Sequence, residues 1–294
     1  MKSRAFVIVA LIASLLGPIV GIGASSAATI PFAGLRPFTL VVPLTYDSAI
    51  PAPLIIALSG YNQTGADMEK YLHLTSLAAA NGILYVYPDG TKDSRGVRFW
   101  NGTTECCDFQ SPKVDDDSYL MSMIDQISAH YSVDPNRIYI IGHSNGGFLA
   151  NALGCRHADR IAAVVSIAGA SYTKIPACKP SAPISVLEIW GTKDVTFVGN
   201  HIRGSPIPGA VTTFKNWGVI DGCTTMPVTL PDKLDLDTKV PGAETTVTEF
   251  QGCPAKTIIS FWQMAGSGHS PQFSQIFNQK LLDFLLAHPK TATN

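Results

Sequence analysis

The sequence predicts an α/β fold with a mainly parallel sheet and helices on both faces. Two patterns along the 294 residues carry this prediction. Short apolar runs rich in β-branched residues recur along the chain, and they are continuous rather than alternating, which is typical of strands buried on both faces. Segments with helical spacing of apolar residues lie between these runs, and such an alternation indicates parallel strands joined by crossover helices. With 46% hydrophobic and 15% charged residues, the composition excludes a disordered chain.

The expected strands are the continuous apolar runs, two of which end at clear turn signals. The run 53–58 ends at Ser59-Gly60, and the run 83–88 ends at Asp89-Gly90. In chain order, the expected strands are 38–43, 53–58, 83–88, 137–142, 162–168, 184–190 and 257–263.

Four segments between the strands have helical spacing. In the first of them Met68, Tyr71 and Leu72 recur at such a spacing. The second begins beside Asp115–Asp117, and acidic side chains stabilise a helix N-terminus as caps or in the first turn. No glycine-rich phosphate loop opens any of these helices, so the sequence does not support nucleotide binding. The expected helices are 67–81, 117–131, 146–154 and 271–288.

The stretch 195–256 interrupts the alternation. It contains prolines at six positions and two of the cysteines. We expect a helix over 210–219, followed by a Thr-rich hairpin that a Cys223–Cys253 bond pins. The chain shows no repeat or linker, so we expect one domain over residues 28–294 without a large cap.

Residues 1–27 are expected to form a secretory signal peptide. Two basic residues precede the apolar stretch 5–22, and small residues follow it, which are the three parts of such a leader. Cleavage after Ala27 or Ala28 fits this pattern. The alternative is an uncleaved membrane anchor, but the apolar stretch is marginal for a span and Pro18 interrupts it. We therefore expect a secreted, extracellular protein that has no membrane contact after cleavage.

Six cysteines in a secreted chain favour disulfides. Loop closure favours the bonds Cys155–Cys178 and Cys223–Cys253, because partners near in sequence meet most readily. The adjacent residues Cys106 and Cys107 remain, either bonded to each other or as two buried free thiols. The sequence has no Cys-x-x-Cys or closely spaced Cys/His set, so we expect no metal site.

The sharpest motif is Gly142-His143-Ser144-Asn145-Gly146, which joins the strand 137–142 to the helix 146–154. This strand–turn–helix context is that of a nucleophile elbow, in which glycines two residues before and after the serine allow a tight turn. The turn lifts the serine hydroxyl to the carboxyl edge of the sheet. We therefore expect Ser144 to be a catalytic nucleophile. The alternative is a glycine-rich turn with a capping serine.

A serine nucleophile needs a base and a carboxylate that orients the base, here in the chain order Ser, acid, His. His269 lies between the last strand and the last helix, at the expected carboxyl edge, and is the expected base. His201 is the alternative base. Asp194 follows the strand 184–190 at the same edge and is the expected acid. Asp221 is the alternative acid, although it lies outside the regular strand–loop pattern.

A tetrahedral intermediate also needs hydrogen-bond donors for its oxyanion. The expected donors are the backbone N–H of Asn145 and the backbone N–H of Tyr61, which lies in the loop after the strand 53–58. Trp100 and Trp190 lie on or near edge loops. Both are candidates for an aromatic substrate cleft, and packing in the core or at the rim is the alternative.

With these residues placed, the chain from about Phe38 to His288 resembles the secreted α/β-hydrolase esterases grouped with polyhydroxybutyrate depolymerases and feruloyl esterases. The resemblance implies an α/β-hydrolase fold, a triad of Ser144, Asp194 and His269, and an oxyanion hole of Tyr61 and Asn145. The motifs that carry it are 60–64, 87–90, 100–101 with 106–107, 114–116, 134–139, 142–147, 191–194, 221–223 and 268–269.

The chain departs from this family around the mouth of the expected site. Many members have His-Gly where this chain has Ser59-Gly60 and Trp190-Gly191, and they often have a Trp-Pro pair where this chain has Ser270-Pro271-Gln272. These departures bear on substrate choice rather than on the type of reaction.

The resemblance implies a secreted serine carboxylic ester hydrolase that forms an acyl-enzyme, with no metal or organic cofactor. The expected substrates are polyesters, such as a polyhydroxyalkanoate or an aromatic polyester, or hydroxycinnamoyl esters. The alternatives are a serine peptidase of the same fold and a non-catalytic protein that binds a polymer or carbohydrate. Because the formal net charge is -1, nothing favours nucleic acid as a partner. We expect a monomer.

Overall fold

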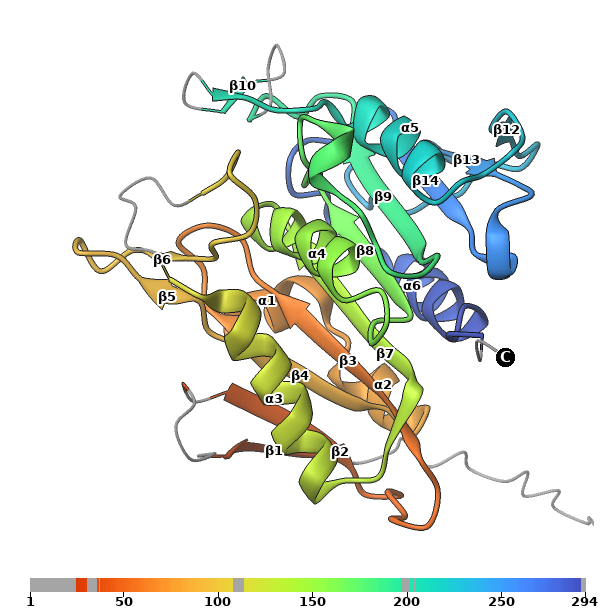
Figure 1. The fold of residues 1–294 in the computed structure, drawn as a ribbon. Helices are drawn as coiled ribbons and strands as arrows, with labels where there is room; N and C mark the ends of the chain where they lie inside the picture. The colour runs from red at the N-terminus through yellow and green to blue at the C-terminus, as the bar shows by residue number, and fades with distance from the viewer. Residues whose placement is uncertain are drawn as a thin grey trace, which may run out of the picture.

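The computed structural model describes residues 25–30, 36, 38–107, 114–196, 201–202 and 205–291. Within these residues, ten strands form one large sheet (Figure 1). Their order across the sheet is β1 (Ser25–Ile30), β2 (Phe38–Pro43), β4 (Leu84–Pro88), β3 (Ala52–Leu58), β7 (Val133–His143), β8 (Ala163–Ile167), β9 (Ser185–Gly191), β14 (Ile259–Met264), β13 (Thr245–Phe250) and β12 (Val228–Thr229).

The neighbouring strands from β4 to β14 run parallel. Antiparallel strands flank them, with β2 and β1 on one side and β13 and β12 on the other. The prediction of a mainly parallel sheet is therefore confirmed. Because parallel strands end at one edge of a sheet, the loops that follow β3, β7, β9 and β14 all open at the same edge.

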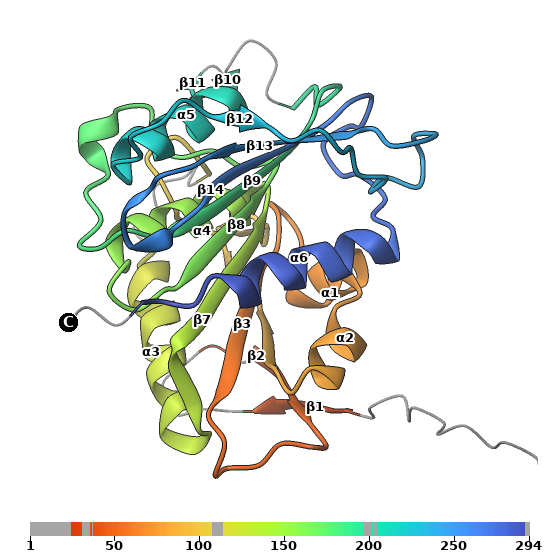
Figure 2. The same ribbon diagram turned by 90° about the vertical axis from the view of Figure 1, so that its right-hand side faces the viewer.

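Helices cover both faces of the sheet, as Figure 2 shows from the side. On one face lie α3 (Asp116–His130), α4 (Asn145–Arg156) and α5 (Ala210–Ile220), and on the other lie α1 (Gly65–Leu72), α2 (Thr75–Ala80) and α6 (Gln275–Ala287). Each strand feeds both cores, since successive side chains point to opposite faces. Ile56 of β3 packs in the core under α3, α4 and α5, whereas Ile55 packs in the core under α1, α2 and α6.

The expected helix 67–81 is wrong, because the structure divides it into α1 and α2. His73 ends α1 in the left-handed conformation, with φ 51°, and its N–H donates to the carbonyl of Glu69. The apolar spacing continues across this break, so the pattern could not reveal it. The expected helix 271–288 also begins later, at Gln275. The hydroxyl of Ser274 caps it by accepting a hydrogen bond from the N–H of Phe277.

The stretch 195–256 both covers part of one face of the sheet and extends the sheet. Within the part of this stretch that the structure describes, α5 packs on β9 and β14, and β12 and β13 add to the sheet beyond β14. Among the described residues, two small antiparallel pairs lie outside the main sheet. They are β5 (Thr91–Lys92) with β6 (Arg98–Phe99), and β10 (His201–Ile202) with β11 (Ser205–Pro206).

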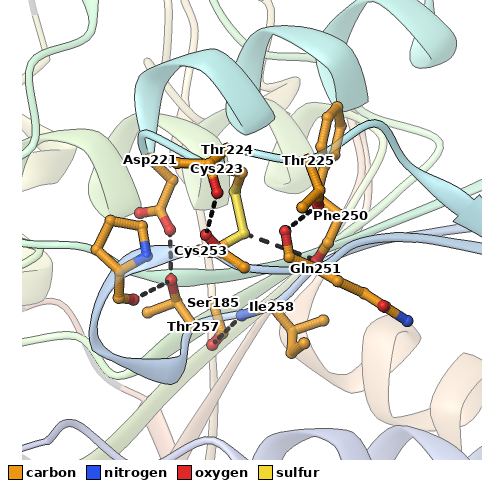
Figure 3. The surroundings of a disulfide bond; sticks show 12 residues. Ser185, Asp221, Cys223, Thr224, Thr225, Phe250, Gln251, Cys253, Thr257 and Ile258 are labelled. Carbon is orange, nitrogen blue, oxygen red and sulfur yellow. Dashed lines mark hydrogen bonds between the residues drawn. A yellow bond between two sulfur atoms is a disulfide. The ribbon is translucent and has the colours of Figure 1, made fainter.

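All six cysteines form disulfides. Cys155 bonds to Cys178 and Cys223 to Cys253, as predicted from loop closure, with Cα–Cα distances of 5.4 and 4.0 Å. Cys106 and Cys107 bond to each other across a cis peptide bond, so the alternative of two free thiols is wrong. Figure 3 shows that the Cys223–Cys253 bond joins the end of α5 to the segment between β13 and β14.

Residues 1–24 of the expected signal peptide lie outside the described residues, and residues 25–30 form β1. No helix among the described residues is both long and apolar enough to cross a membrane.

Candidate active site

Ser144 lies at the sharp turn between β7 and α4. Its backbone is in an unusual conformation, with φ 52° and ψ −116°. The N–H of Ser144 donates to the carbonyl of Ile167 at 2.7 Å, and the carbonyl of Ser144 accepts from the N–H of Phe148 at 3.1 Å. These two bonds tie the strained residue to β8 and to the first turn of the helix, which stabilises a conformation that the residue alone would not adopt.

The glycines of the elbow are required by close backbone contacts. A Cβ atom on Gly142 would lie 2.0 Å from the carbonyl oxygen of Gly146, and a Cβ on Gly146 would lie 2.2 Å from the carbonyl oxygen of Leu58. Backbone atoms cannot move away as a flexible side chain can. Side chains at either position would therefore force β7, α4 and the end of β3 apart.

The structure brings His269 and Asp194 to Ser144. His269 comes from the loop between β14 and α6, and its Nε2 lies 2.8 Å from Ser144 Oγ. Its Nδ1 lies 2.7 Å from Asp194 Oδ2. The carboxylate of Asp194 is fully buried, whereas the His269 side chain is 22% exposed. The second carboxylate oxygen of Asp194 accepts a hydrogen bond from the N–H of Thr196 at 2.9 Å. The imidazole thus lies between a hydroxyl and a buried carboxylate.

Hydrogen bonds between the acid loop and the base loop hold this geometry. The N–H of Lys193 donates to the carbonyl of Ser267 at 2.8 Å, and the N–H of Gly266 donates to the Thr192 hydroxyl at 2.9 Å. Because β9 and β14 are parallel neighbours, these two loops leave the sheet side by side. The register of the strands therefore sets the distance between Asp194 and His269.

The two expected oxyanion donors lie on the segments that border Ser144. Asn145 begins α4, so its N–H belongs to a helix N-terminus, where the helix dipole favours negative charge. Tyr61 follows Gly60 in the loop after β3. The side chain of Gln63 holds this loop by accepting a hydrogen bond from the N–H of Gly60 at 2.9 Å, and the N–H of Asn62 donates to the carbonyl of Arg98 at 2.7 Å.

The two candidate tryptophans have different environments. The Trp100 ring is completely buried in the core that includes α3 and α4, so it does not line an open cleft, and the expected substrate contact for it is wrong. Trp100 instead binds the side chain of Asn145 through its backbone. Trp190 is the next-to-last residue of β9, is partly exposed and packs against the edge of the same core.

A small apolar cluster lies beside the elbow, separate from the two main cores. It contains the Cys106–Cys107 disulfide, Phe148 of α4, Ala170 and Ile207, and the partly buried Tyr61 packs against it. The Tyr61 hydroxyl accepts a hydrogen bond from Arg95 at 3.1 Å. The disulfide therefore helps to build the wall next to the two expected oxyanion donors.

The alternative acid, Asp221, has a structural role away from Ser144. It ends α5, and its Oδ1 accepts a hydrogen bond from the N–H of Ile184 at 2.7 Å. Its other oxygen accepts from the Thr257 hydroxyl, as Figure 3 shows. Asp221 also lies near Cys223 and Cys253 in the one group of possible metal ligands found among the described residues, but both sulfurs are in a disulfide.

The alternative base, His201, lies on the small β10–β11 pair, and only its backbone is described. His157, at the end of α4, faces Asp117, with 2.5 Å between Nε2 and Oδ1. Of the histidines after Ser144, His269 is the one for which the structure describes a bond to the serine hydroxyl.

Two buried polar residues near the elbow were missed in the sequence. His143 precedes Ser144 and is only 3% exposed, and Nε2 of its ring lies 3.1 Å from the carbonyl oxygen of His269. Glu188 of β9 is 1% exposed and pairs in register with Ser166 of β8. Glu188 is the one charged residue of the expected strand 184–190, and this charge in a mostly apolar run was a signal that the sequence offered.

Comparisons with known proteins find similarity to esterases and to a polyester depolymerase. The chain is 28% identical over 229 residues to feruloyl esterase B of Piromyces equi, a match that covers 74% of this chain and 40% of that protein. It is 28% identical over 126 residues to poly(3-hydroxyalkanoate) depolymerase C of Paucimonas lemoignei, with 41% and 28% covered. The chain thus spans less than half the length of these relatives.

The fold is also that of solved esterase structures. The structure of the acetyl xylan esterase from Aspergillus awamori matches with a TM-score of 0.63 and 15% identity, over 90% of this chain and 99% of that one. This likeness supports the α/β-hydrolase fold. The family model described as esterase PHB depolymerase matches residues 39–189. Since this match covers more than half of the chain, the protein belongs to the esterase PHB depolymerase family.

Proposed function

We propose that the protein is a serine carboxylic ester hydrolase in which Ser144 is the nucleophile, His269 the general base and Asp194 the orienting acid. The observation that carries this proposal is the continuous set of contacts from Ser144 Oγ to His269 Nε2 and from His269 Nδ1 to the buried Asp194 carboxylate. The base is within hydrogen-bond reach of the nucleophile, and the acid fixes the ring orientation.

The reaction follows from these positions. His269 takes the proton of the Ser144 hydroxyl through Nε2 as Oγ attacks the ester carbonyl. The protonated ring is stabilised by Asp194 and then gives its proton to the departing alcohol. Water, activated by the same nitrogen, releases the acid from the acyl-enzyme. The backbone N–H groups of Asn145 and Tyr61 are proposed to bind the oxyanion of each tetrahedral intermediate.

The family and the activities named for its relatives favour particular ester classes. They include feruloyl esterases and a poly(3-hydroxyalkanoate) depolymerase. We therefore propose a hydroxycinnamoyl ester or a polyester as the substrate class. A polyhydroxyalkanoate and an aromatic polyester are the two polyesters to be compared.

Secretion belongs to the same proposal. Three disulfides are typical of a protein that matures in an oxidising compartment. The pattern of residues 1–27 is that of a cleaved leader. The proposed working unit is residues 28–294, acting as one catalytic domain and as a monomer.

Hydrolysis of p-nitrophenyl butyrate by purified protein tests the proposal. We expect turnover by the unchanged protein and its loss in Ser144→Ala, with the same circular dichroism spectrum. Ser128→Ala is the matched control, because Ser128 is exposed on α3. Equal turnover by Ser144→Ala and the unchanged protein would reject the proposal.

A substrate panel then separates the ester classes and the alternative activity. It compares methyl ferulate, a polyhydroxybutyrate film, an aromatic polyester film and a chromogenic peptide. Faster cleavage of the peptide than of every ester would favour a serine peptidase. Binding to a film without any hydrolysis would favour a non-catalytic binding protein.

A further inference from the structure

His143 occupies a position from which it contacts the three segments that build the proposed site. It is the last residue of β7 and is bonded covalently to Ser144. Its ring is buried and packs against Tyr71 of α1, with 4.8 Å between the ring centroids. The centroid of the His269 ring lies 5.2 Å from that of the His143 ring.

The hydrogen bonds of His143 indicate which ring nitrogen carries the proton, and its pKa indicates whether the ring is charged. Its Nε2 lies 3.1 Å from the carbonyl oxygen of His269 and 3.2 Å from the hydroxyl of Ser270. A carbonyl oxygen only accepts, so Nε2 carries the proton and donates. Burial, and then the neighbouring His269, lowers the pKa of His143 to about 4. The ring is therefore neutral at the pH at which an ester hydrolase is assayed.

The other ring nitrogen of His143 faces the proposed oxyanion loop. Nδ1 is buried without a hydrogen-bond partner among the described residues. A Cβ atom placed on Gly60 would lie 3.1 Å from it, so the backbone at Gly60 lies directly against the ring. Gly60 immediately precedes Tyr61. One side chain thus contacts the loop of the base and the loop of a proposed oxyanion donor, while its backbone leads into the nucleophile.

We propose that His143 is a positioning residue that holds the backbone of His269 in register with Ser144 through the Nε2–H donor. This inference rests on the proposed triad and assigns a role that the triad itself does not contain. Since His143 and Ser144 are adjacent, the hydrogen bond to the His269 carbonyl links base and nucleophile through a few covalent bonds. Small displacements of reacting groups cost large factors in rate, so a fixed link of this kind matters for turnover.

Two amide substitutions separate the donor from the ring. In His143→Gln the side-chain nitrogen lies as many bonds from Cα as Nε2 does, so it can reach the His269 carbonyl. In His143→Asn the same amide group is one methylene shorter and cannot reach it. His157→Gln is the matched control, since His157 bonds to Asp117 rather than to the base loop.

Steady-state kinetics with p-nitrophenyl butyrate measure the effect. We expect His143→Asn to lower kcat about tenfold to a hundredfold, with KM changed much less. We expect His143→Gln to recover most of kcat, and His157→Gln to behave as the unchanged protein. The rate at which a fluorophosphonate labels Ser144 should fall in parallel, because labelling needs the same proton transfer to His269.

The pH profile of kcat/KM adds a readout that a purely structural role would not move. The titratable groups that face His143 are His269, Asp194 and Tyr71, and none of them is changed in these variants. We expect the acid limb of the profile to shift in His143→Asn and to return in His143→Gln, because the limb reports the base in its positioned form.

Each outcome decides for or against the proposal. Equal kcat and labelling rates in His143→Asn and the unchanged protein would overturn it. If His143→Asn does not fold, the proposal is overturned when His143→Gln folds but has lost kcat by about tenfold or more, because the donor would then not restore function. The proposed catalytic triad fails by a separate result, namely full turnover by Ser144→Ala.

Discussion

The side chain of Asn145 forms two hydrogen bonds with the backbone of Trp100. Its Oδ1 accepts from the Trp100 N–H at 2.6 Å, and its Nδ2 donates to the Trp100 carbonyl at 2.8 Å. Asn145 is completely buried. The residue whose N–H is proposed to bind the oxyanion is therefore fixed by a pair of bonds to the residue after β6, and its carboxamide supplies the acceptor of one bond and the donor of the other.

Substitution of Asn145 tests this pair of bonds. Asn145→Ala leaves a buried N–H and a buried carbonyl of Trp100 unpaired, at a cost of about 1–3 kcal/mol each. We expect a lower denaturant midpoint and a lower kcat, because the first turn of α4 loses its anchor. Asn136→Ala is the control, since Asn136 is exposed. An unchanged kcat in folded Asn145→Ala would show that the pair is not needed for turnover.

Asp194→Asn tests the proposed acid. The amide keeps the size of the carboxylate but removes its charge and presents a donor as well as an acceptor to His269 Nδ1. The imidazole can then be held in the wrong tautomer, and its charged form is no longer stabilised. We expect kcat for p-nitrophenyl butyrate to fall by about a thousandfold or more. A loss of less than about tenfold, in a protein with an unchanged spectrum, would contradict the assignment.

Glu188 provides a pH-dependent contribution to stability. Burial raises the pKa of Glu188 to about 8, and the nearby Ser166 and Asn151 side chains oppose this rise only in part. Between the ordinary glutamate pKa of 4.5 and about 8 the folded state thus binds more protons at this site than the unfolded state. By linkage, the contribution is fully present below pH 4.5 and is lost as pH rises through 8.

Glu188→Gln should remove that dependence. Urea unfolding midpoints of the two proteins, taken at about pH 5, 7 and 9, measure this dependence. These conditions span most of the range between the two pKa values of Glu188. We expect the variant to gain stability relative to the unchanged protein as the pH rises, with most of the gain complete by the highest pH. A constant difference between the two urea midpoints at all three pH values would mean that Glu188 ionises in the folded state as it does in the unfolded chain.

The Cys223–Cys253 disulfide is expected to stabilise the region around α5 and β13 without taking part in catalysis. It closes a sequence separation of 30 residues, and a loop of this size contributes on the order of 3 kcal/mol through the entropy of the unfolded chain. The double variant Cys223→Ser/Cys253→Ser should therefore melt at a lower temperature. It should keep kcat at temperatures where it remains folded, which thermal melts followed by circular dichroism and ester assays on the same samples check.

Local patterns in the sequence were sufficient to predict the parallel sheet and the turn that carries Ser144. Continuous apolar runs mark buried strands, and Gly142 and Gly146 mark a turn that only glycine allows. The order of strands also placed His269 and Asp194 at one edge of the sheet, since the carboxyl ends of parallel strands meet there. These features depend on residues close together in the chain and on a rule of topology, so they can be read without coordinates.

Tertiary structure alone decided which side chains meet across that edge. His143 reaches the carbonyl of a residue 126 positions later, and Asn145 binds the backbone of a residue 45 positions earlier. Trp100 looks like a surface aromatic in the sequence but is buried, and the left-handed His73 divides a helix whose apolar spacing is unbroken. Side-chain contacts of this kind depend on how helices and loops pack over the sheet, and apolar periodicity carries no record of that packing.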